Sequence, residues 1–390
     1  MKKILIGGVY YGEHNIGDEG LLFSIIRSFE PYAEINVLTN GSEWIDNVFP
    51  KANRYPIRLN YIKPSCGLYT IPRSKVITNW FKIRKEIDFY RQYDLYICGG
   101  ATILSDCPYY SLRTVLLAEK AGVPVILWGV GMAEISDENT KKFIVDVLNR
   151  KGVKKVFVRD EYVQKRLWEL GVEKNKVDVS YDPAIMLEGT NFDMAKFMND
   201  DSLKWYRQSD CNVVVSVSGE SDIADKTPVN KIADEIIAIK QKYNANIILV
   251  PTGCGKQCKD TEMLKTLGSM VGTKNVTVIE KEFQPEELVE FLKNVKLVIS
   301  SRLHMNIFAA CAGVPSVGLV RNLKIVDFAS KFNLPYLYFD NMSKNDIVKK
   351  SDEVMDNYRN ITSSMATIRT GMRQKYTEST EQVKQMLHEK

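Results

Sequence analysis

Length, composition and charge limit what kind of protein this is. The chain has 390 residues, which is long for one hydrophobic core and predicts two domains. Hydrophobic residues make up 45% of the chain and charged residues 26%, which excludes a disordered or fibrous protein. The net charge of +5 is not gathered into a basic stripe, so no nucleic-acid partner is expected, whereas an anionic ligand or an acidic membrane surface remains open.

The first apolar run, KILIGGV (3–9), predicts a β-strand and not a signal peptide, because glycines interrupt it and no small-residue cleavage site follows. No apolar run reaches the ~20 residues of a membrane span. The seven cysteines are odd in number and irregularly spaced, which favours reduced thiols over a disulfide framework. We therefore expect a cytoplasmic protein that is soluble or at most peripheral to a membrane.

Short β-branched runs alternate with amphipathic stretches through the first half, the pattern of parallel strands joined by crossover helices. The runs predict strands at 3–9, 34–39, 94–98, 123–128 and 155–159. The amphipathic stretches predict helices near 18–30, 79–90, 110–121, 137–150 and 160–170.

The same alternation restarts after a polar, irregular stretch at about 188–211. It predicts strands at 212–218, 246–250, 276–280, 296–300 and 316–320, followed by a long helical segment. We therefore predict an N-terminal Rossmann-like domain over 1–187, a C-terminal Rossmann-like domain over 188–342, and a helical segment over 343–390 that could pack back on the first domain.

The fold class is α/β, with two domains facing a cleft. Ligands of open α/β sheets bind beyond the carboxyl ends of the strands, so the loops that follow the strands are the candidate walls of the site. The N-terminal domain is the expected acceptor side.

The first such loop, GVYYGEHNIGDEGLL (8–22), leads from a strand into a helix that begins near Asp18 and Glu19. These carboxylates could simply cap the helix and complement its dipole. Alternatively, Asn15 and the N–H of Gly17 hold an anion or a sugar, and an acidic side chain accepts a hydroxyl proton. The spacing excludes both the dinucleotide fingerprint and the nucleotide P-loop.

Two further loops follow strands of the first half. Gly99 and Gly100, in CGGATILSD (98–106), allow a close approach of the backbone to a ligand or to a neighbouring strand. Arg159 ends a strand in VFVRDEY, where it could form a salt bridge with Asp160 or hold an anion together with a second cation.

SSRLHMNIFAACAGVPSVGL (300–319) offers that second cation. If Ser300 or Ser301 caps the following helix, Arg302, Leu303 and His304 form its first turn, where the backbone favours an anion. The remainder of the helix is apolar on all faces and is predicted to be buried. A histidine in such a helix could be a satisfied core residue, but Arg302 and His304 together favour an anionic partner.

PTGCGKQCKD (251–260) contains a C-x-x-x-C pair, but it has no second ligand pair and lacks the rest of a P-loop. We expect a loop at the edge of the cleft, with Lys256 or Lys259 near an anion, and no metal site.

Taken together, these motifs resemble those of the polysaccharide pyruvyl transferase family. The resemblance is carried by NIGDE (15–19), GGATILSD (99–106), GVG (129–131), VRD (158–160), YDP (181–183) and the SRLH segment, in that order. It implies two Rossmann-like halves similar to the B-type glycosyltransferase fold. It also implies transfer of a pyruvyl group from phosphoenolpyruvate to a saccharide as a cyclic ketal, with Arg159, Arg302 and His304 tied to the donor.

This chain departs from the family pattern in three loops, one of which, GVGMAE, lacks the usual proline. Ala101, Thr102 and Ser105 stand where the family usually has glycines and a glutamine, and Arg321 begins a loop that often reads Tyr-Asp-Pro-Lys. The acceptor is therefore the least transferable part of the resemblance.

The expected chemistry needs no metal and no cofactor, with phosphoenolpyruvate as co-substrate. His304 would protonate its methylene carbon, and Asp18 or Glu19 would accept a proton from an acceptor hydroxyl. The acceptor is a saccharide of cell-surface polysaccharide biosynthesis, which could be lipid-linked at the inner membrane surface. The alternatives are a B-type glycosyltransferase that uses a nucleotide sugar and a non-catalytic saccharide-binding relative.

Overall fold

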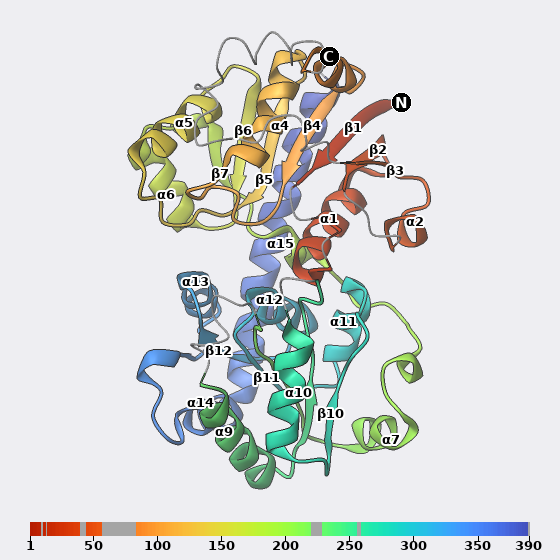
Figure 1. Cartoon of the computed structure of the whole chain (residues 1–390), viewed down its shortest axis with the longest axis vertical. Coiled ribbons are helices and arrows are strands. Elements are labelled where there is room, and N and C mark those ends of the chain that lie inside the picture. Colours follow the sequence, from red (N-terminus) through yellow and green to blue (C-terminus); the bar gives the residue numbers. More distant parts are fainter. Residues whose placement is uncertain are drawn as a thin grey trace. The chain divides into compact units, whose positions relative to one another are not determined.

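The computed structural model describes residues 1–8, 11–12, 14–39, 44–56, 83–219, 228–255 and 259–388 (Figure 1). It divides into two compact units. The N-terminal unit comprises Met1–Glu13, Leu21–Pro183 and Gln374–Lys390, and the C-terminal unit comprises His14–Gly20 and Ala184–Arg373.

The N-terminal unit contains a 7-stranded sheet in the order β3-β2-β1-β4-β5-β6-β7. All of its described strand pairs are parallel. Its strands are β1 (Lys2–Gly7), β2 (Ala33–Leu38), β3 (Asn53–Tyr55), β4 (Leu95–Gly99), β5 (Val125–Val130), β6 (Val153–Val158) and β7 (Val177–Val179). The five predicted strands of this half are confirmed, whereas β3 and β7 are too short to show a hydrophobic period.

Helices cover both faces of this sheet. One face packs against α4 (Tyr109–Lys120), α5 (Glu138–Leu148) and α6 (Glu161–Leu170), which share a core with inward side chains such as Leu127 of β5. On the opposite face, Phe29 of α1 (Ile16–Phe29) meets the ring of Trp128 at a centroid distance of 5.6 Å. The short helix α2 (Trp44–Val48) follows β2, and residues 83–90 are helical. The first part of the predicted helix at 79–90 lies outside the described residues.

The C-terminal unit contains a 6-stranded sheet in the order β10-β9-β8-β11-β12-β13, again parallel in every described pair. Its strands are β8 (Asn212–Ser216), β9 (Asn246–Leu249), β10 (Val276–Val278), β11 (Leu297–Ser300), β12 (Ser316–Val320) and β13 (Tyr336–Tyr338). The sequence predicts the first five of these strands and misses β13.

One face of this second sheet packs against α9 (Val229–Lys242), α10 (Asp260–Val271) and α14 (Asp346–Asp356). The other helices of the unit are α7 (Asp200–Gln208), α11 (Pro285–Leu292), α12 (Leu303–Ala312) and α13 (Leu323–Lys331). Helix α12 is buried from Met305 to Cys311, as its apolar sequence predicts. The two units are therefore both parallel α/β sheets, and the predicted fold class is confirmed.

The long helix α15 (Tyr358–His388) ends the described chain. Its residues from Gln374 onward belong to the N-terminal unit, where Tyr376 packs on Trp128 at 5.4 Å between ring centroids and bonds to Ser28 Oγ at 3.0 Å. Its earlier residues belong to the C-terminal unit, where Arg373 Nε donates to Ile185 O at 2.9 Å.

The segment 14–20 falls on the other side of the division that the sequence suggests. It lies within the predicted domain 1–187, but its contacts group it with the C-terminal unit. The reason is local: Ile16 N donates to Thr252 O at 3.1 Å and Cys254 N donates to His14 O at 2.9 Å. The NIGDE motif is thus held by the backbone of the loop that follows β9.

Candidate functional site

The carboxyl edge of the second sheet has its topological switch point between β8 and β11, the neighbouring strands from which the strand order runs outward in opposite directions. Ligands of open α/β sheets bind in the crevice outside such a point. Ser218 and Gly219 follow β8 there, and Ser301 and Arg302 follow β11. The SRLH motif therefore begins at the position where this architecture places a ligand.

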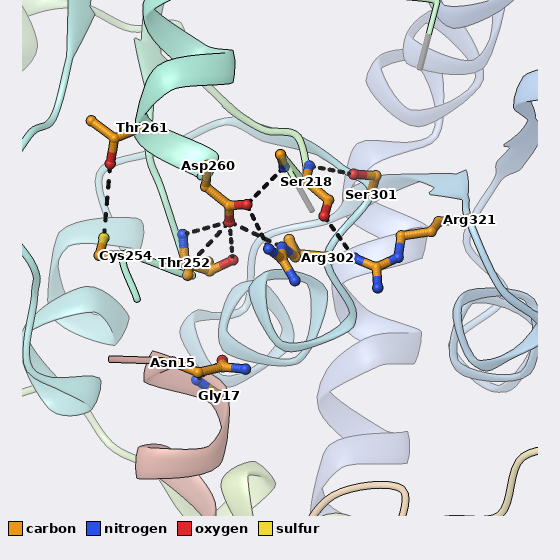
Figure 2. Close-up of polar contacts among 12 residues, drawn as sticks. Asn15, Gly17, Ser218, Thr252, Cys254, Asp260, Thr261, Ser301, Arg302 and Arg321 are labelled. Atoms are coloured by element: carbon orange, nitrogen blue, oxygen red, sulfur yellow. Dashed lines mark hydrogen bonds and ion pairs between the residues drawn. The ribbon is translucent and has the colours of Figure 1, made fainter. Parts of the chain in front are cut away.

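Arg302 lies beside a buried carboxylate at this edge (Figure 2). Its Nε donates to Asp260 Oδ2 at 3.0 Å and its Nη2 donates to Asp260 Oδ1. The Arg302 side chain is 11% exposed and the Asp260 side chain is 0% exposed. The guanidinium thus forms a bidentate ion pair, so its positive charge is already partly offset before any anion arrives.

Arg302 is the N-cap residue of α12, and Leu303 and His304 begin the helix. The expectation that Ser300 or Ser301 caps the helix, which would put Arg302 in its first turn, is wrong. The Ser300 hydroxyl instead accepts the N–H of Arg302 at 2.9 Å, and the Ser301 hydroxyl accepts the N–H of Ser218 at 2.9 Å. Ser300 thus stabilises the turn that follows β11, and Ser301 joins the end of β11 to the end of β8.

His304 lies against the NIGDE motif. A Cβ added to Gly17 would fall 2.0 Å from His304 Nδ1, so only glycine allows this approach of the two segments. Asn15 supports the turn, because its side-chain oxygen accepts the N–H of Gly17 at 3.1 Å. The structure therefore brings the turn formed by Asn15 and Gly17 against His304. Leu303 precedes His304 at the start of α12.

Asp18 and Glu19 lie in the first turn of α1 and are each 6% exposed. Their position at a helix N-terminus fits the capping interpretation, because the helix dipole stabilises negative charge there. It also leaves them one and two residues after Gly17, which contacts the His304 ring. Both interpretations of these carboxylates thus remain compatible with their position.

The glycine loops of the N-terminal unit pack against a tyrosine. A Cβ on Gly99 would fall 2.4 Å from the Tyr11 hydroxyl, and one on Gly8 would fall 2.7 Å from Gly99 O. Gly100 has φ +82°, a backbone conformation that favours glycine. The close approach at Gly99 and Gly100 is therefore made by the protein itself, at the switch point between β1 and β4.

Arg159 is buried at the end of β6. Its Nε lies 3.6 Å from Asp160 Oδ2, and its Nη2 donates to Thr102 Oγ1 at 3.4 Å. A Cβ on Gly131 would meet the guanidinium at 2.4 Å from Cζ, so the GVG sequence makes room for Arg159. The salt bridge that the sequence suggests is present, although Asp160 also caps α6 by accepting the N–H of Val163 at 2.7 Å.

The loop after β9 carries no reactive thiol among its described residues. Burial raises the pKa of the Cys254 thiol to about 12, so this thiol stays protonated at neutral pH. Cys258 and Lys256 lie outside the described residues, and Lys259 is the N-cap residue of α10. Cys98, Cys107, Cys211, Cys254 and Cys311 are free cysteines in the structure, and Cys66 lies outside the described residues.

Sequence reasoning missed two residues of this edge. Asp260 begins α10, and nothing in the sequence distinguishes it from a capping carboxylate. Arg321 follows β12 and its Nη1 donates to Ser218 Oγ at 2.6 Å (Figure 2). The departure of the Arg321 loop from the family pattern was the available signal, because it placed a cation directly after a strand.

Several solved structures share this fold, among them proteins named as UDP-N-acetylglucosamine 2-epimerases and proteins solved with UDP bound. A Listeria monocytogenes protein assigned as a UDP-N-acetylglucosamine 2-epimerase is 12% identical with a TM-score of 0.65, covering 100% of this chain and 98% of its own. Anabaena HepE in complex with UDP is 13% identical with a TM-score of 0.62, covering 100% of both chains. The Neisseria meningitidis UDP-GlcNAc 2-epimerase bound to UDP-GlcNAc is 16% identical with a TM-score of 0.60, covering 99% and 100%.

At these identities the likeness establishes the fold alone, namely two Rossmann-like domains of the B-type glycosyltransferase kind. A search of curated protein sequences gives no significant match. No helix in the described part of the chain is both long and apolar enough to cross a membrane. A family model for polysaccharide pyruvyl transferases, however, matches residues 15–322, a span that runs from the NIGDE motif past the SRLH motif and Arg321. The chain therefore belongs to the polysaccharide pyruvyl transferase family.

Proposed function

We propose that this protein transfers a pyruvyl group from phosphoenolpyruvate to a saccharide acceptor, forming a cyclic ketal and releasing phosphate. One observation carries the proposal: the imidazole of His304 rests on Gly17 of NIGDE, within two residues of the arginine that follows β11. The two most specific family motifs thus form one group of side chains in the C-terminal unit. Family membership makes the pyruvyl group the natural candidate for transfer.

The donor carries a phosphate and a carboxylate, and guanidinium groups bind such oxyanions bidentately. We assign Arg302 to the donor. Asp260 accepts from Nε and Nη2 of this guanidinium, which fixes its plane at the sheet edge. We also propose that Arg159 contributes to donor binding.

His304 is the proposed general acid. It would give a proton to the methylene carbon of phosphoenolpyruvate, which becomes a methyl group while positive charge develops at C2. An acceptor hydroxyl then adds to C2 and loses its proton to a carboxylate, for which Asp18 or Glu19 is the candidate. A second hydroxyl of the same sugar then forms a bond to C2 while the bond between C2 and the phosphate oxygen breaks, and its proton leaves with the phosphate, which closes the ketal. Acid–base help of this kind is worth roughly 10²- to 10⁴-fold.

The reaction needs neither a metal nor a cofactor in this proposal, because arginine side chains offset the charge of the donor. The acceptor is proposed to be a saccharide of cell-surface polysaccharide synthesis, handled in the cytoplasm. A lipid-linked acceptor would bring the enzyme to the membrane surface as a peripheral protein.

Mass spectrometry of candidate acceptors after incubation with phosphoenolpyruvate tests the proposal. We expect an acceptor that gains a pyruvate ketal, with one phosphate released for each ketal formed. A panel of acceptors that stays unmodified, with no phosphate release and no binding of phosphoenolpyruvate, would contradict it.

A second candidate function is transfer of a sugar from a nucleotide sugar. The observation that favours it is the shared fold with proteins solved with UDP or UDP-GlcNAc bound. Release of a nucleoside diphosphate instead of phosphate would identify this reaction. Binding of saccharides without any turnover would instead indicate a non-catalytic relative.

A further inference from the structure

The ion pair between Asp260 and Arg302 is deeply buried at the candidate site. Asp260 is fully buried, and both of its oxygens accept hydrogen bonds from described residues. Two of the donors are Arg302 Nε and Nη2. Others are the backbone N–H groups of Gly219 at 2.8 Å and Gly253 at 3.0 Å, with the N–H and the hydroxyl of Thr252 each at 3.4 Å.

We propose that Asp260 is a positioning residue of the transfer reaction, which acts by fixing the direction of the Arg302 guanidinium. This inference rests on the proposed function, because it takes Arg302 as a donor-binding residue. Asp260 itself is assigned no contact with the substrate.

Backbone hydrogen bonds fix the Asp260 carboxylate, so it can hold the Arg302 side chain in one orientation. Its oxygens connect the loops that follow three strands, through Gly219 after β8, Gly253 after β9 and Arg302 after β11. A free arginine side chain samples many rotamers, and a planar bidentate partner selects one of them before a ligand binds. The guanidinium is therefore oriented relative to the sheet edge before a donor binds.

Only a carboxylate suits this position. Oδ1 accepts from Gly219 N and Arg302 Nη2, and Oδ2 accepts from Arg302 Nε and Gly253 N. An asparagine would replace either Oδ1 or Oδ2 with an NH₂ group. In both cases this group would face N–H donors and could not accept their hydrogen bonds. Asp260→Asn should therefore lose the bidentate pair with Arg302, although the side chain keeps its size.

The experiment compares Asp260→Asn with a matched control, Glu86→Gln. Glu86 also forms a buried carboxylate–guanidinium pair, with Arg113, at side-chain exposures of 8% and 12%. It lies in the N-terminal unit and has no assigned part in the reaction. Both variants break a buried ion pair, so both should lower the thermal midpoint, but only Asp260→Asn should change the kinetics.

We expect Asp260→Asn to lower kcat/KM for phosphoenolpyruvate about a hundredfold, the size of effect that a misplacement of about 1 Å can produce. In an Arg302→Gln background, the same change should lower kcat/KM less than about threefold, because its route through Arg302 is already gone. Asp260→Glu keeps both acceptor oxygens and should recover part of the loss. A separate titration measures the dissociation constant of phosphoenolpyruvate for each variant in the absence of an acceptor.

Additive losses in the double variant, or kinetics of Asp260→Asn that match those of Glu86→Gln, would overturn the inference and leave the proposed function standing. If Asp260→Asn does not fold, Asp260→Glu decides: an activity equal to that of the unchanged protein contradicts the positioning role. A failure of the proposed function is recognised differently, because then the unchanged protein itself neither binds nor consumes phosphoenolpyruvate.

Discussion

His304 is the residue on which the proposed chemistry most depends. It lies at the start of α12, and its ring contacts Gly17 of α1. Its proposed role is to transfer a proton to the donor. We expect His304→Ala to reduce phosphate release from phosphoenolpyruvate by roughly 10²- to 10⁴-fold while the protein stays folded, as measured by a phosphate assay and circular dichroism. Near-normal turnover in a folded variant would remove His304 from the role of acid.

Arg159 has two possible roles, a structural ion pair and the binding of the donor, and a substitution distinguishes them. It forms an ion pair with Asp160 and a hydrogen bond with Thr102, and we also propose that it binds the donor. If the proposal is right, Arg159→Ala should weaken phosphoenolpyruvate binding by more than about tenfold in a calorimetric titration, since a hydrogen bond to a charged group is worth about 1.5–3 kcal/mol. An unchanged dissociation constant together with lower thermal stability would reduce Arg159 to its structural ion pair.

A substitution at Gly17 tests whether the close approach of the N-terminus of α1 to His304 matters for catalysis. In Gly17→Ala the new methyl group would lie 2.0 Å from His304 Nδ1, so the ring must move. We expect kcat to fall by at least about tenfold, because a displaced acid no longer lies in line with its acceptor carbon.

Gly371→Ala is the control for this substitution. Gly371 lies inside α15 and a Cβ there would meet nothing within 4 Å, so the variant should keep full activity. It should also gain up to about 1 kcal/mol of stability from helix propensity. Equal activity losses in the two variants would show that the close approach to His304 is not the cause.

At the scale of elements, α15 shows how a helix distant in sequence completes a core. Tyr376 is 1% exposed, and it packs on Trp128 while its hydroxyl bonds to Ser28. Tyr376→Ala should lower the free energy of unfolding by about 3–5 kcal/mol, measured by denaturant titration, because it removes a buried aromatic ring from the face of the first sheet.

Tyr376→Phe separates the contribution of the ring to the free energy of unfolding from that of the hydroxyl. It keeps the ring and removes one hydrogen bond, which should lower the free energy of unfolding by only about 1 kcal/mol. If the two variants were equally destabilised, the packing of the ring on Trp128 would not be what holds this part of α15.

The elements of the sheets were predictable because each carries its own hydrophobic period. Strands such as β1, β5 and β12 are short apolar runs, and α5 and α6 have apolar stripes bounded by the caps Asp137 and Asp160. The three-residue strands β3, β7 and β13 were missed, because each is defined mainly by the neighbour with which it pairs. The strand β10 is as short, but it was predicted because it lies in the apolar run at 276–280.

For the whole molecule, the proposed donor should act as a stabilising ligand. A ligand that binds only the folded state adds RT ln(1 + [L]/Kd), which is about 2.7 kcal/mol at a hundred times the dissociation constant. We therefore expect the thermal midpoint of the intact chain to rise with phosphoenolpyruvate concentration. The rise should be absent in Arg302→Gln, and stabilisation by UDP but not by phosphoenolpyruvate would favour the nucleotide-sugar candidate.

The sequence alone determined the α/β class, the two repeating halves, the strand-end loops and the family to which the chain belongs. These follow from local hydrophobic periods and from motifs that stay together in the chain. Only the tertiary structure decided which loops meet. It groups the NIGDE segment with the C-terminal unit, turns Gly17 against His304, and pairs Arg302 with Asp260. Such contacts depend on strand order and on which side chains share one sheet edge, and no local pattern in a single sequence records that.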